Sequence, residues 1–248
     1  MPTLVPAGGP ALGEGAICYS GRHRIEEIPM QKKIKKPAKV PVHHAPPPNQ
    51  VRIIGGQWKR SVLPVLQALG LRPTPDRVRE TVFNWINHLR DGDWANAQVL
   101  DLFAGSGALG FEAASRGAGS VIMVDTHTPV IRQLEENKTK LRAENVQLLR
   151  GDALLTAQGL AARGQRFDVI FLDPPYQQDF LAKALPLCAN LLKEGGIVYA
   201  ESGLPLVFDA DSDVEKPDWM APWEVIRADK AGTVYYHLLT YNKVPATA

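Results

Sequence analysis

The chain has 248 residues, of which 45% are hydrophobic and 22% are charged, and this composition predicts one substantial folded core. No run reaches the roughly 18 apolar residues of a membrane-spanning helix, and the N-terminus lacks the basic start of a secretory signal, so we expect a cytoplasmic protein. Cys18 and Cys188 form no redox or metal-binding spacing, so neither a disulfide framework nor a metal site is expected.

The net charge of +2 is unevenly distributed along the chain. Residues 1–60 hold ten of the 28 Lys and Arg residues but only three of the 26 Asp and Glu residues, a net charge of +7, which leaves −5 for the rest. Because each phosphate that a basic segment contacts releases condensed counterions, such a segment suits RNA or DNA. A solubilising tail is the alternative interpretation.

Two patterns precede the main domain. Residues 1–49 are rich in Pro, Gly and Lys and show neither helical nor strand periodicity, so we expect a disordered basic arm. Residues 51–56 are typical of a short strand that runs into a glycine turn, and residues 57–66 are typical of its returning partner. A small β-hairpin is therefore expected in front of the core.

The segment 71–89 predicts a helix that starts at Pro75, and together with the hairpin it makes an N-terminal unit at residues 50–95. Thr74 is the expected N-cap and Pro75 the first helical residue. Apolar residues recur at helical spacing and predict one buried face, made of Val78, Val82, Phe83, Ile86 and Leu89.

From residue 96 to residue 248, apolar strands alternate with longer helical segments, which is typical of a parallel α/β sheet. Strands are predicted at residues 99–103, 120–125, 146–150, 167–173 and 196–202. Residues 224–241 contain two β-prone runs about a Lys-Ala-Gly turn and predict an antiparallel hairpin at the sheet edge. The expected core is a Rossmann-like, mostly parallel seven-stranded sheet with helices on both faces.

A glycine-rich turn follows the first of these strands. Gly105, Gly107 and Gly110 have the spacing G-x-G-x-x-G, and glycine lets the backbone turn sharply and approach a ligand at a helix N-terminus. The spacing alone is weak evidence. A dinucleotide-binding enzyme uses the same glycines with an acidic residue about 20 positions further on, where this chain has Asp125. A purely structural turn is also compatible with the pattern.

Two acidic positions favour S-adenosylmethionine over a dinucleotide. Asp101 precedes the glycine turn, where a carboxylate would repel a pyrophosphate but would suit the methionyl ammonium group. Asp152 follows the third strand, where it would accept a hydrogen bond from the adenine amine, and Ala153 would offer its backbone N–H. The alternatives are a turn carboxylate for Asp101 and a helix cap for Asp152.

The fourth strand ends in Asp173, Pro174, Pro175 and Tyr176, at the edge where open α/β sheets bind ligands. Because two prolines remove N–H groups and fix φ, the Pro174 carbonyl and the Asp173 carboxylate form a rigid acceptor pair for an NH₂ group. Such acceptors would stabilise positive charge on an exocyclic base amine as it attacks a sulfonium methyl, and Tyr176 would stack on the base. The alternative is an ordinary strand-end turn. No cysteine here suits thiolate-dependent carbon methylation.

Four segments together resemble the bacterial small-subunit ribosomal RNA guanine-N2 methyltransferase family of the RsmD type. The similarity covers roughly residues 51–242, and the motifs that carry it are RIIGG at 52–56, LRPTPDRVRETVFNWI at 71–86, VLDLFAGSGALGFEAASRGA at 99–118 and DVIFLDPPY at 168–176. The resemblance implies a class I S-adenosylmethionine-dependent methyltransferase fold. It also implies that the protein, as a monomer, methylates a guanine amine of 16S ribosomal RNA in the assembled or assembling small subunit.

The same resemblance implies roles for individual residues. Thr74 and Arg77 would lie near the cofactor or the active site, and Phe103 and Ser106 would join the glycine turn in holding the cofactor. Three basic residues would face RNA, namely Arg52, Lys59 and Arg60. The alternatives are a helix cap for Thr74, a surface ion pair for Arg77 and solvated charge for the basic residues.

Three other functions remain open at this point. A DNA adenine-N6 methyltransferase uses the same acceptor pair, an NAD-dependent oxidoreductase uses the same glycine spacing, and a non-catalytic RNA-binding protein with a methyltransferase fold accounts for the basic arm. The intact tetrapeptide at 173–176 argues against the last of these.

Overall fold

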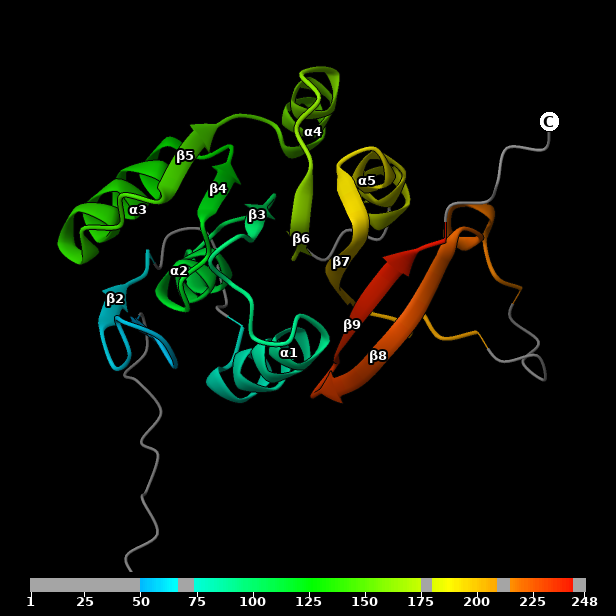
Figure 1. Cartoon of the computed structure of the whole chain (residues 1–248), viewed down its shortest axis with the longest axis horizontal. Helices are drawn as coiled ribbons and strands as arrows, with labels where there is room; N and C mark the ends of the chain where they lie inside the picture. Colours follow the sequence, from blue (N-terminus) through cyan, green and yellow to red (C-terminus); the bar gives the residue numbers. More distant parts are fainter. Residues whose placement is uncertain (1–49, 67–73, 175–179, 209–214, 243–248) are drawn as a thin grey trace, which may run out of the picture. The chain divides into compact units, whose positions relative to one another are not determined.

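The computed structural model describes residues 50–66, 74–174, 180–208 and 215–242, so the predicted arm at residues 1–49 lies outside the described residues. Within the described part, a central sheet has the order β5-β4-β3-β6-β7-β9-β8 (Figure 1). Its strands are β3 Gln98–Asp101, β4 Ser120–Asp125, β5 Val146–Arg150, β6 Phe167–Leu172, β7 Leu192–Ser202, β8 Trp223–Ala231 and β9 Val234–Tyr241. Strands β3 to β7 are parallel, whereas β9 runs antiparallel to β7 and to β8.

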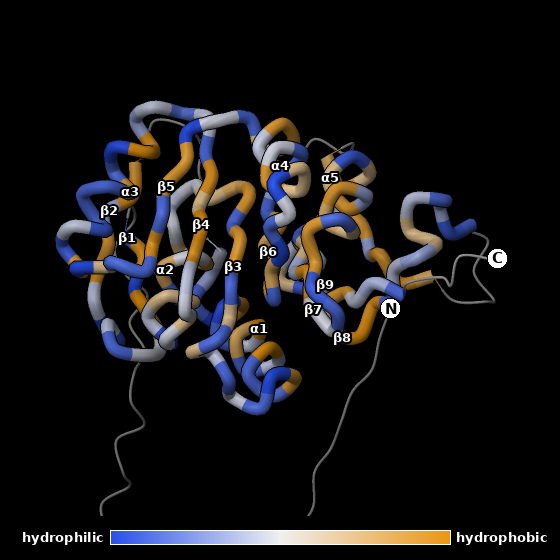
Figure 2. Tube along the Cα trace, turned by 45° about the horizontal axis from the view of Figure 1, so that its top comes forward, coloured by the Kyte–Doolittle hydropathy of each residue, from blue (hydrophilic) through white to orange (hydrophobic). Residues whose placement is uncertain are grey.

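Two helical layers cover this sheet because successive strand residues point to opposite faces. Helices α1 Asp76–Leu89, α2 Ala108–Ser115 and α3 Thr128–Leu141 share one apolar cluster, whereas α4 Ala153–Ala162 and α5 Phe180–Ala189 share the other. Val99 of β3 belongs to the first cluster and Leu100 to the second. Figure 2 shows the hydrophobic stretch of β4. Among the described residues, no helix is long and apolar enough to cross a membrane.

The structure confirms the predicted seven-stranded sheet and corrects some boundaries. Strands β4 and β5 have the predicted bounds, and the edge hairpin β8–β9 is antiparallel as expected. Strand β7 begins at Leu192, four residues before the predicted start, because it continues through an irregularity at which its register with β6 shifts. Gly195 has φ +70° there, a conformation that glycine adopts without strain.

Two predictions about helix α1 were wrong. The helix begins at Asp76 with Pro75 as its N-cap, and no side chain caps it, because the Thr74 hydroxyl is used elsewhere. Four of the five predicted core residues are buried, but Leu89 in the last turn is 38% exposed. The apolar face therefore ends one turn earlier than the periodicity predicts.

The predicted N-terminal hairpin is present as β1 Gln50–Arg52 paired antiparallel with β2 Val62–Pro64. Its turn packs on the end of α2, where the buried Glu112 carboxylate accepts hydrogen bonds from the N–H groups of Ile54 (2.7 Å) and Gly55 (2.8 Å). Gly56 has φ +73°, and a Cβ there would lie 1.8 Å from the Ser115 carbonyl oxygen. The two glycines therefore allow the turn to approach the helix.

Arg79 connects the hairpin to α1 and α2 and is fully buried. Its guanidinium donates to the Asp76 carboxylate (2.6 Å), to the Arg52 carbonyl (2.9 Å) and to the Thr74 carbonyl (3.2 Å), and lies 3.8 Å from the Glu112 carboxylate. Burial lowers the pKa of Arg79, whereas the two carboxylates raise it. This buried charge network holds the hairpin on the helix that follows the glycine turn.

We expect Glu112→Ala to lower the free energy of unfolding by about 3–5 kcal/mol, because removal of one partner leaves the buried Arg79 charge without its full compensation. Chemical denaturation measures this change. The exposed Glu135→Ala is the control and should stay within about 0.5 kcal/mol of the wild type. Equal stabilities of the two variants would contradict the structural role of the network.

Candidate active site

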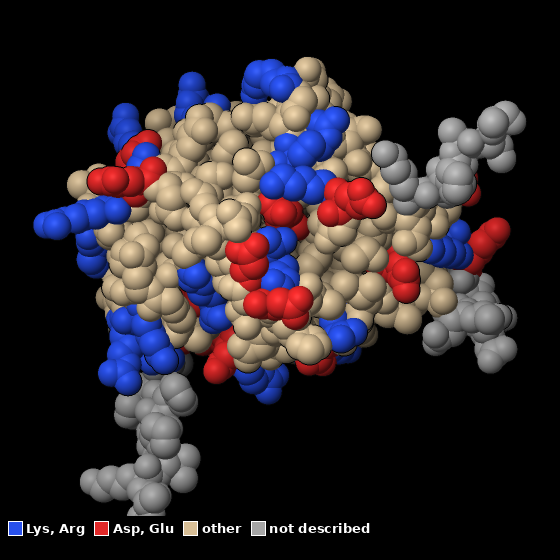
Figure 3. Space-filling model, viewed as in Figure 1, with Lys and Arg blue, Asp and Glu red and all other residues tan. Residues whose placement is uncertain are grey.

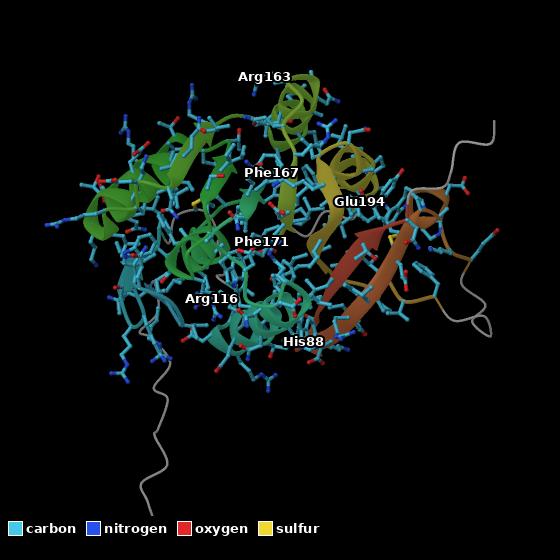
Figure 4. The ribbon with its side chains drawn as sticks, in the orientation of Figure 1. His88, Arg116, Arg163, Phe167, Phe171 and Glu194 are labelled. Carbon is cyan, nitrogen blue, oxygen red and sulfur yellow. The ribbon has the colours of Figure 1, made fainter. Side chains whose placement is uncertain are left out.

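Acidic residues gather at the edge of the sheet where the parallel strands end. They lie at or next to the ends of five strands that are side by side in the sheet, and they are Asp101, Asp125, Asp152, Asp173 and Glu201. Parallel strands bring these ends together, and open α/β sheets bind ligands at this edge. In Figure 4, the labelled Phe167 begins β6 and the labelled Phe171 is its next-to-last residue, so Asp173 follows shortly after Phe171 along the chain.

The glycine turn between β3 and α2 is tightly packed. Gly105 and Gly107 have φ of +48° and +77°, and a Cβ on Gly107 would lie 2.6 Å from the Leu134 side chain. Ser106 Oγ accepts from the Ala108 N–H (3.3 Å), which is a hydrogen bond within the turn. The predicted sharp turn at a helix N-terminus is therefore present.

Phe103 lies at the start of this turn and is half-buried. Its ring packs edge-on against the ring of Phe180, with the centroids 5.6 Å apart. This contact holds the Phe103 side chain in place. The predicted contact of Phe103 with the cofactor stays a prediction.

Asp101 is almost completely buried beneath the turn. Its Oδ2 accepts from the Gly110 N–H (3.1 Å), but its Oδ1 has no hydrogen-bond partner among the described residues. Burial raises the pKa of Asp101 to about 7. Since a buried carboxyl oxygen without a donor is energetically costly, this atom is a place for a cationic N–H donor such as an ammonium group.

Asp125 lies at the end of β4, with a side chain that is 10% exposed. Its carboxylate accepts from the N–H groups of Gly105 (3.1 Å) and His127 (2.8 Å), and the His127 ring lies 3.1 Å away. Because a carboxylate offers about four acceptor positions, these bonds leave it able to accept from ribose hydroxyls. The residue therefore joins the glycine turn to the next strand.

Asp152 caps helix α4, and its Oδ1 accepts from the Leu155 N–H (2.9 Å). The cap is the structural role that the sequence left open for it. Ala153 begins the helix, where a first-turn N–H has no partner within the helix. Contact of either residue with adenine stays a prediction.

Asp173 lies in a cluster of hydrogen-bonding groups that the sequence did not predict. The Thr74 hydroxyl lies 3.4 Å from Asp173 Oδ2 and 3.0 Å from Glu201 Oε1, and the Tyr199 hydroxyl donates to Glu201 Oε1 at 2.6 Å. Burial and the neighbouring Glu201 and Asp101 raise the pKa of Asp173 well above its usual value. Pro174 follows and is buried.

The other half of the tetrapeptide, Pro175 and Tyr176, lies outside the described residues. Glu201 is the site residue that the sequence analysis missed. An acidic residue near the end of an apolar strand was the available signal, and the same signal identified Asp101 and Asp125. Thr74 is brought to the site as the resemblance implies, through the hydrogen bonds that replace its expected role as a helix cap.

The remaining basic candidates lie away from this cluster. Arg77 is exposed on α1, close enough to Asp229 and Tyr236 of the edge hairpin to affect their pKa values. Arg52 is half-buried and paired with Asp76 at 2.8 Å, whereas Lys59 and Arg60 are exposed on the hairpin turn.

Lys and Arg side chains gather over the β1–β2 hairpin in Figure 3. Since Arg52 is already held in an ion pair, Lys59 and Arg60 are the freer of the three predicted RNA ligands. The hairpin therefore presents positive charge on the same unit that is fixed to α2.

The strand order, the glycine turn and the acidic sheet edge together define a class I S-adenosylmethionine-dependent methyltransferase fold. Solved structures share it. A putative methyltransferase, yhhF, from Escherichia coli matches with a TM-score of 0.64 and 35% identity, over 77% of this chain and 98% of that one. A putative methylase from Haemophilus influenzae matches with a TM-score of 0.58 and 31% identity, over 78% and 99%.

The family model for conserved hypothetical protein 95 matches residues 51–240. The ribosomal RNA small subunit methyltransferase D of Escherichia coli is 40% identical over 191 residues, which cover 76% of this chain and 89% of the relative. The chain therefore belongs to this RsmD-type family of methyltransferases. The predicted family and fold class are confirmed, and membership decides against the oxidoreductase alternative.

The buried Asp101 predicts a pH-dependent stability. In the unfolded chain the Asp101 carboxyl has an ordinary pKa near 3.8, but in the folded protein it keeps its proton up to about pH 7. Between these two pH values the folded state binds more protons than the unfolded state. The contribution of Asp101 to the free energy of unfolding is therefore complete below about pH 4 and is lost as the pH rises to about 7. The free energy of unfolding should therefore fall with rising pH, and Asp101→Asn should reduce the slope of that fall by up to about 1.4 kcal/mol per pH unit.

Urea denaturation at a series of pH values measures this slope for the wild type and the variant. The exposed Asp218→Asn is the matched control. A slope that Asp101→Asn leaves unchanged would show that Asp101 is already ionised in the folded protein at low pH.

Proposed function

We propose that the protein transfers a methyl group from S-adenosylmethionine to the exocyclic N2 amine of a guanine in 16S ribosomal RNA. The observation that carries the proposal is the 40% identity over 191 residues with the ribosomal RNA small subunit methyltransferase D of Escherichia coli. The placement of Asp173 at the carboxyl end of β6 supports the same chemistry, because an amine needs acceptors at the point where it meets the methyl group.

The residues at the sheet edge fit the cofactor. Asp101 Oδ1 would accept from the methionyl ammonium, and Asp125 would accept from the ribose hydroxyls. The remaining proposed contacts come from the glycine turn and from the start of α4, namely Phe103, Gly105, Ser106, Gly107, Asp152 and Ala153. When bound, the cofactor supplies an electrophilic sulfonium methyl group and is left as an uncharged thioether.

The tetrapeptide at 173–176 would hold the target amine. Its lone pair is delocalised into the guanine ring, so the amine is a poor nucleophile until acceptors draw on its N–H groups. The Asp173 carboxyl and the Pro174 carbonyl would accept these two hydrogens, and the Thr74 hydroxyl lies beside Asp173, 3.4 Å from its Oδ2. Tyr176 would stack on the base, because every base presents a π-face.

The hairpin would bring the RNA to this edge. Lys59 and Arg60 are exposed on it and would contact phosphates, with Arg52 beside them, while residues 1–49 would add a basic arm that aids encounter. We further propose that Arg77 lies near the bound RNA or cofactor, that the substrate is the small ribosomal subunit or its assembly intermediate in the cytoplasm, and that the protein acts as a monomer.

Methyl transfer from tritiated S-adenosylmethionine tests the substrate. Small subunits, extracted 16S RNA, large subunits and duplex DNA are offered separately, and label should enter small-subunit RNA. Label in duplex DNA would favour the adenine-N6 alternative. RNA binding without any transfer would favour a non-catalytic RNA-binding protein.

We expect Asp173→Ala to lower single-turnover methylation by on the order of 100-fold or more, because it removes an acceptor that matters most as charge develops on nitrogen. Affinity for S-adenosylhomocysteine, measured by calorimetry, should stay near the wild-type value. A fully active variant would contradict the mechanism, and loss of cofactor affinity would make Asp173 a cofactor ligand instead.

Tyr176→Ala should weaken capture of the base by about 1–3 kcal/mol, because it removes a stacking surface. Tyr176→Phe is the matched control and should be mild, since it keeps the ring. The substrate dependence of single-turnover rates measures both. Equal losses in the two variants would show that the hydroxyl, and not stacking, matters.

A further inference from the structure

We propose that Glu201 is a positioning residue that also receives the reaction's proton, passed to it from the target amine through Asp173. The inference rests on the proposed function, because it concerns the same methyl transfer. It adds to the tetrapeptide a second carboxyl group from the neighbouring strand.

The sheet itself places the two carboxyl groups side by side. Strands β6 and β7 are parallel neighbours, and Leu172 pairs with Ala200 in their register. Asp173 directly follows β6 and Glu201 is the next residue of β7, so the two carboxyl groups lie side by side. The Thr74 hydroxyl lies 3.4 Å from the Asp173 carboxyl and 3.0 Å from the Glu201 carboxyl. Glu201 is buried and Asp173 is half-buried, so the pair is largely removed from water.

The hydrogen-bond donors around the pair decide which carboxyl holds the shared proton. The Tyr199 hydroxyl (2.6 Å) and the Thr74 hydroxyl (3.0 Å) both point to Glu201 Oε1. Thr74 has a single hydroxyl hydrogen, and the alternative acceptor, Asp173 Oδ2, is farther away at 3.4 Å. Two donors therefore stabilise Glu201 as the carboxylate, and Asp173 is the member that keeps the proton.

The charged surroundings agree with one shared proton. Asp101 of β3 and Tyr199 of β7 face the pair, Tyr236 of β9 lies next to Tyr199, and Arg77 of α1 lies beside Tyr236. Burial raises the pKa of both members of the pair, and each carboxyl disfavours ionisation of the other when both are charged. Two neighbouring carboxyl groups of this kind share one proton more readily than they ionise together, and the proposal takes the pair as singly charged.

The proposed proton relay, from the target amine through Asp173 to Glu201, uses this single negative charge. The carbonyl oxygen of the protonated Asp173 accepts a hydrogen bond from the guanine amine. As the nitrogen lone pair forms the bond to the methyl carbon, the bond between that carbon and sulfur breaks and its electron pair stays on sulfur. An N–H bond of the amine also breaks, and its electron pair stays on nitrogen. That proton passes to Asp173, while the proton already on Asp173 passes to Glu201. The pair ends neutral, with two protons, and returns to its first state when one proton leaves to water.

Glu201 has a purely structural alternative, in which it only anchors Thr74 and Tyr199. Glu201→Gln separates the two, because its side-chain oxygen still accepts from both hydroxyls but its amide takes up no proton. Glu194→Gln, an exposed change on the same strand (labelled in Figure 4), is the matched control and should keep wild-type activity.

The experiment is a double-mutant cycle on single-turnover methylation of small subunits, with Glu201→Gln, Asp173→Asn and the double variant. Glu201→Gln should be roughly 10- to 100-fold slower at neutral pH, with an altered pH profile and unchanged S-adenosylhomocysteine affinity. The double variant should be no slower than Asp173→Asn alone, because the two residues act as one unit. Without cofactor, Glu201→Gln should flatten the fall in unfolding free energy with rising pH.

A fully active Glu201→Gln, losses that multiply in the double variant, or a pH dependence of unfolding that the substitution leaves unchanged would each overturn the relay. If the wild-type protein methylates RNA and Glu201→Gln is equally active, the proton relay is contradicted but the proposed function is not. Wild-type protein that methylates no RNA contradicts the proposed function and the relay together.

Discussion

Parallel strands end at one edge of a sheet, and in this protein five neighbouring strands each bring an acidic residue to that edge. Asp101 and Glu201 are buried there and Asp173 is half-buried, and desolvation raises the pKa of each. Buried acids are costly unless a proton, a cation or a donor compensates them. The edge is therefore prepared for positive charge, which both the proposed cofactor and an amine under methylation supply.

The hairpin extends this arrangement to the substrate. Glu112 and Arg79 are buried between α1, α2 and the hairpin turn, and the Arg79 guanidinium also donates to the carbonyl of Thr74. The Thr74 side chain in turn lies beside the carboxyl groups of Asp173 and Glu201. One continuous set of hydrogen bonds thus runs from the proposed RNA-binding hairpin to the proposed catalytic carboxyl group, and it holds the two at a fixed separation.

Sequence alone predicted the elements whose signals are local. Strand β4 is a short apolar run between turns, and the glycine turn needs its positive φ values, so both were found from a few adjacent residues. The Arg79–Glu112 pair was not predicted, because each residue has the pattern of a helix surface until the helices pack together. Glu201 carried the local signal of an acidic residue near a strand end, but its place beside Asp173 depends on the register of two strands, which the sequence does not give.

The identity of the methylated nucleoside tests the central claim most directly, because acceptors at the end of β6 act on an amine. Small subunits labelled by the purified protein are digested to nucleosides and analysed by mass spectrometry. We expect the label in N2-methylguanosine. Label in a ring-carbon product such as 5-methylcytidine, or on a ribose hydroxyl, would contradict that claim.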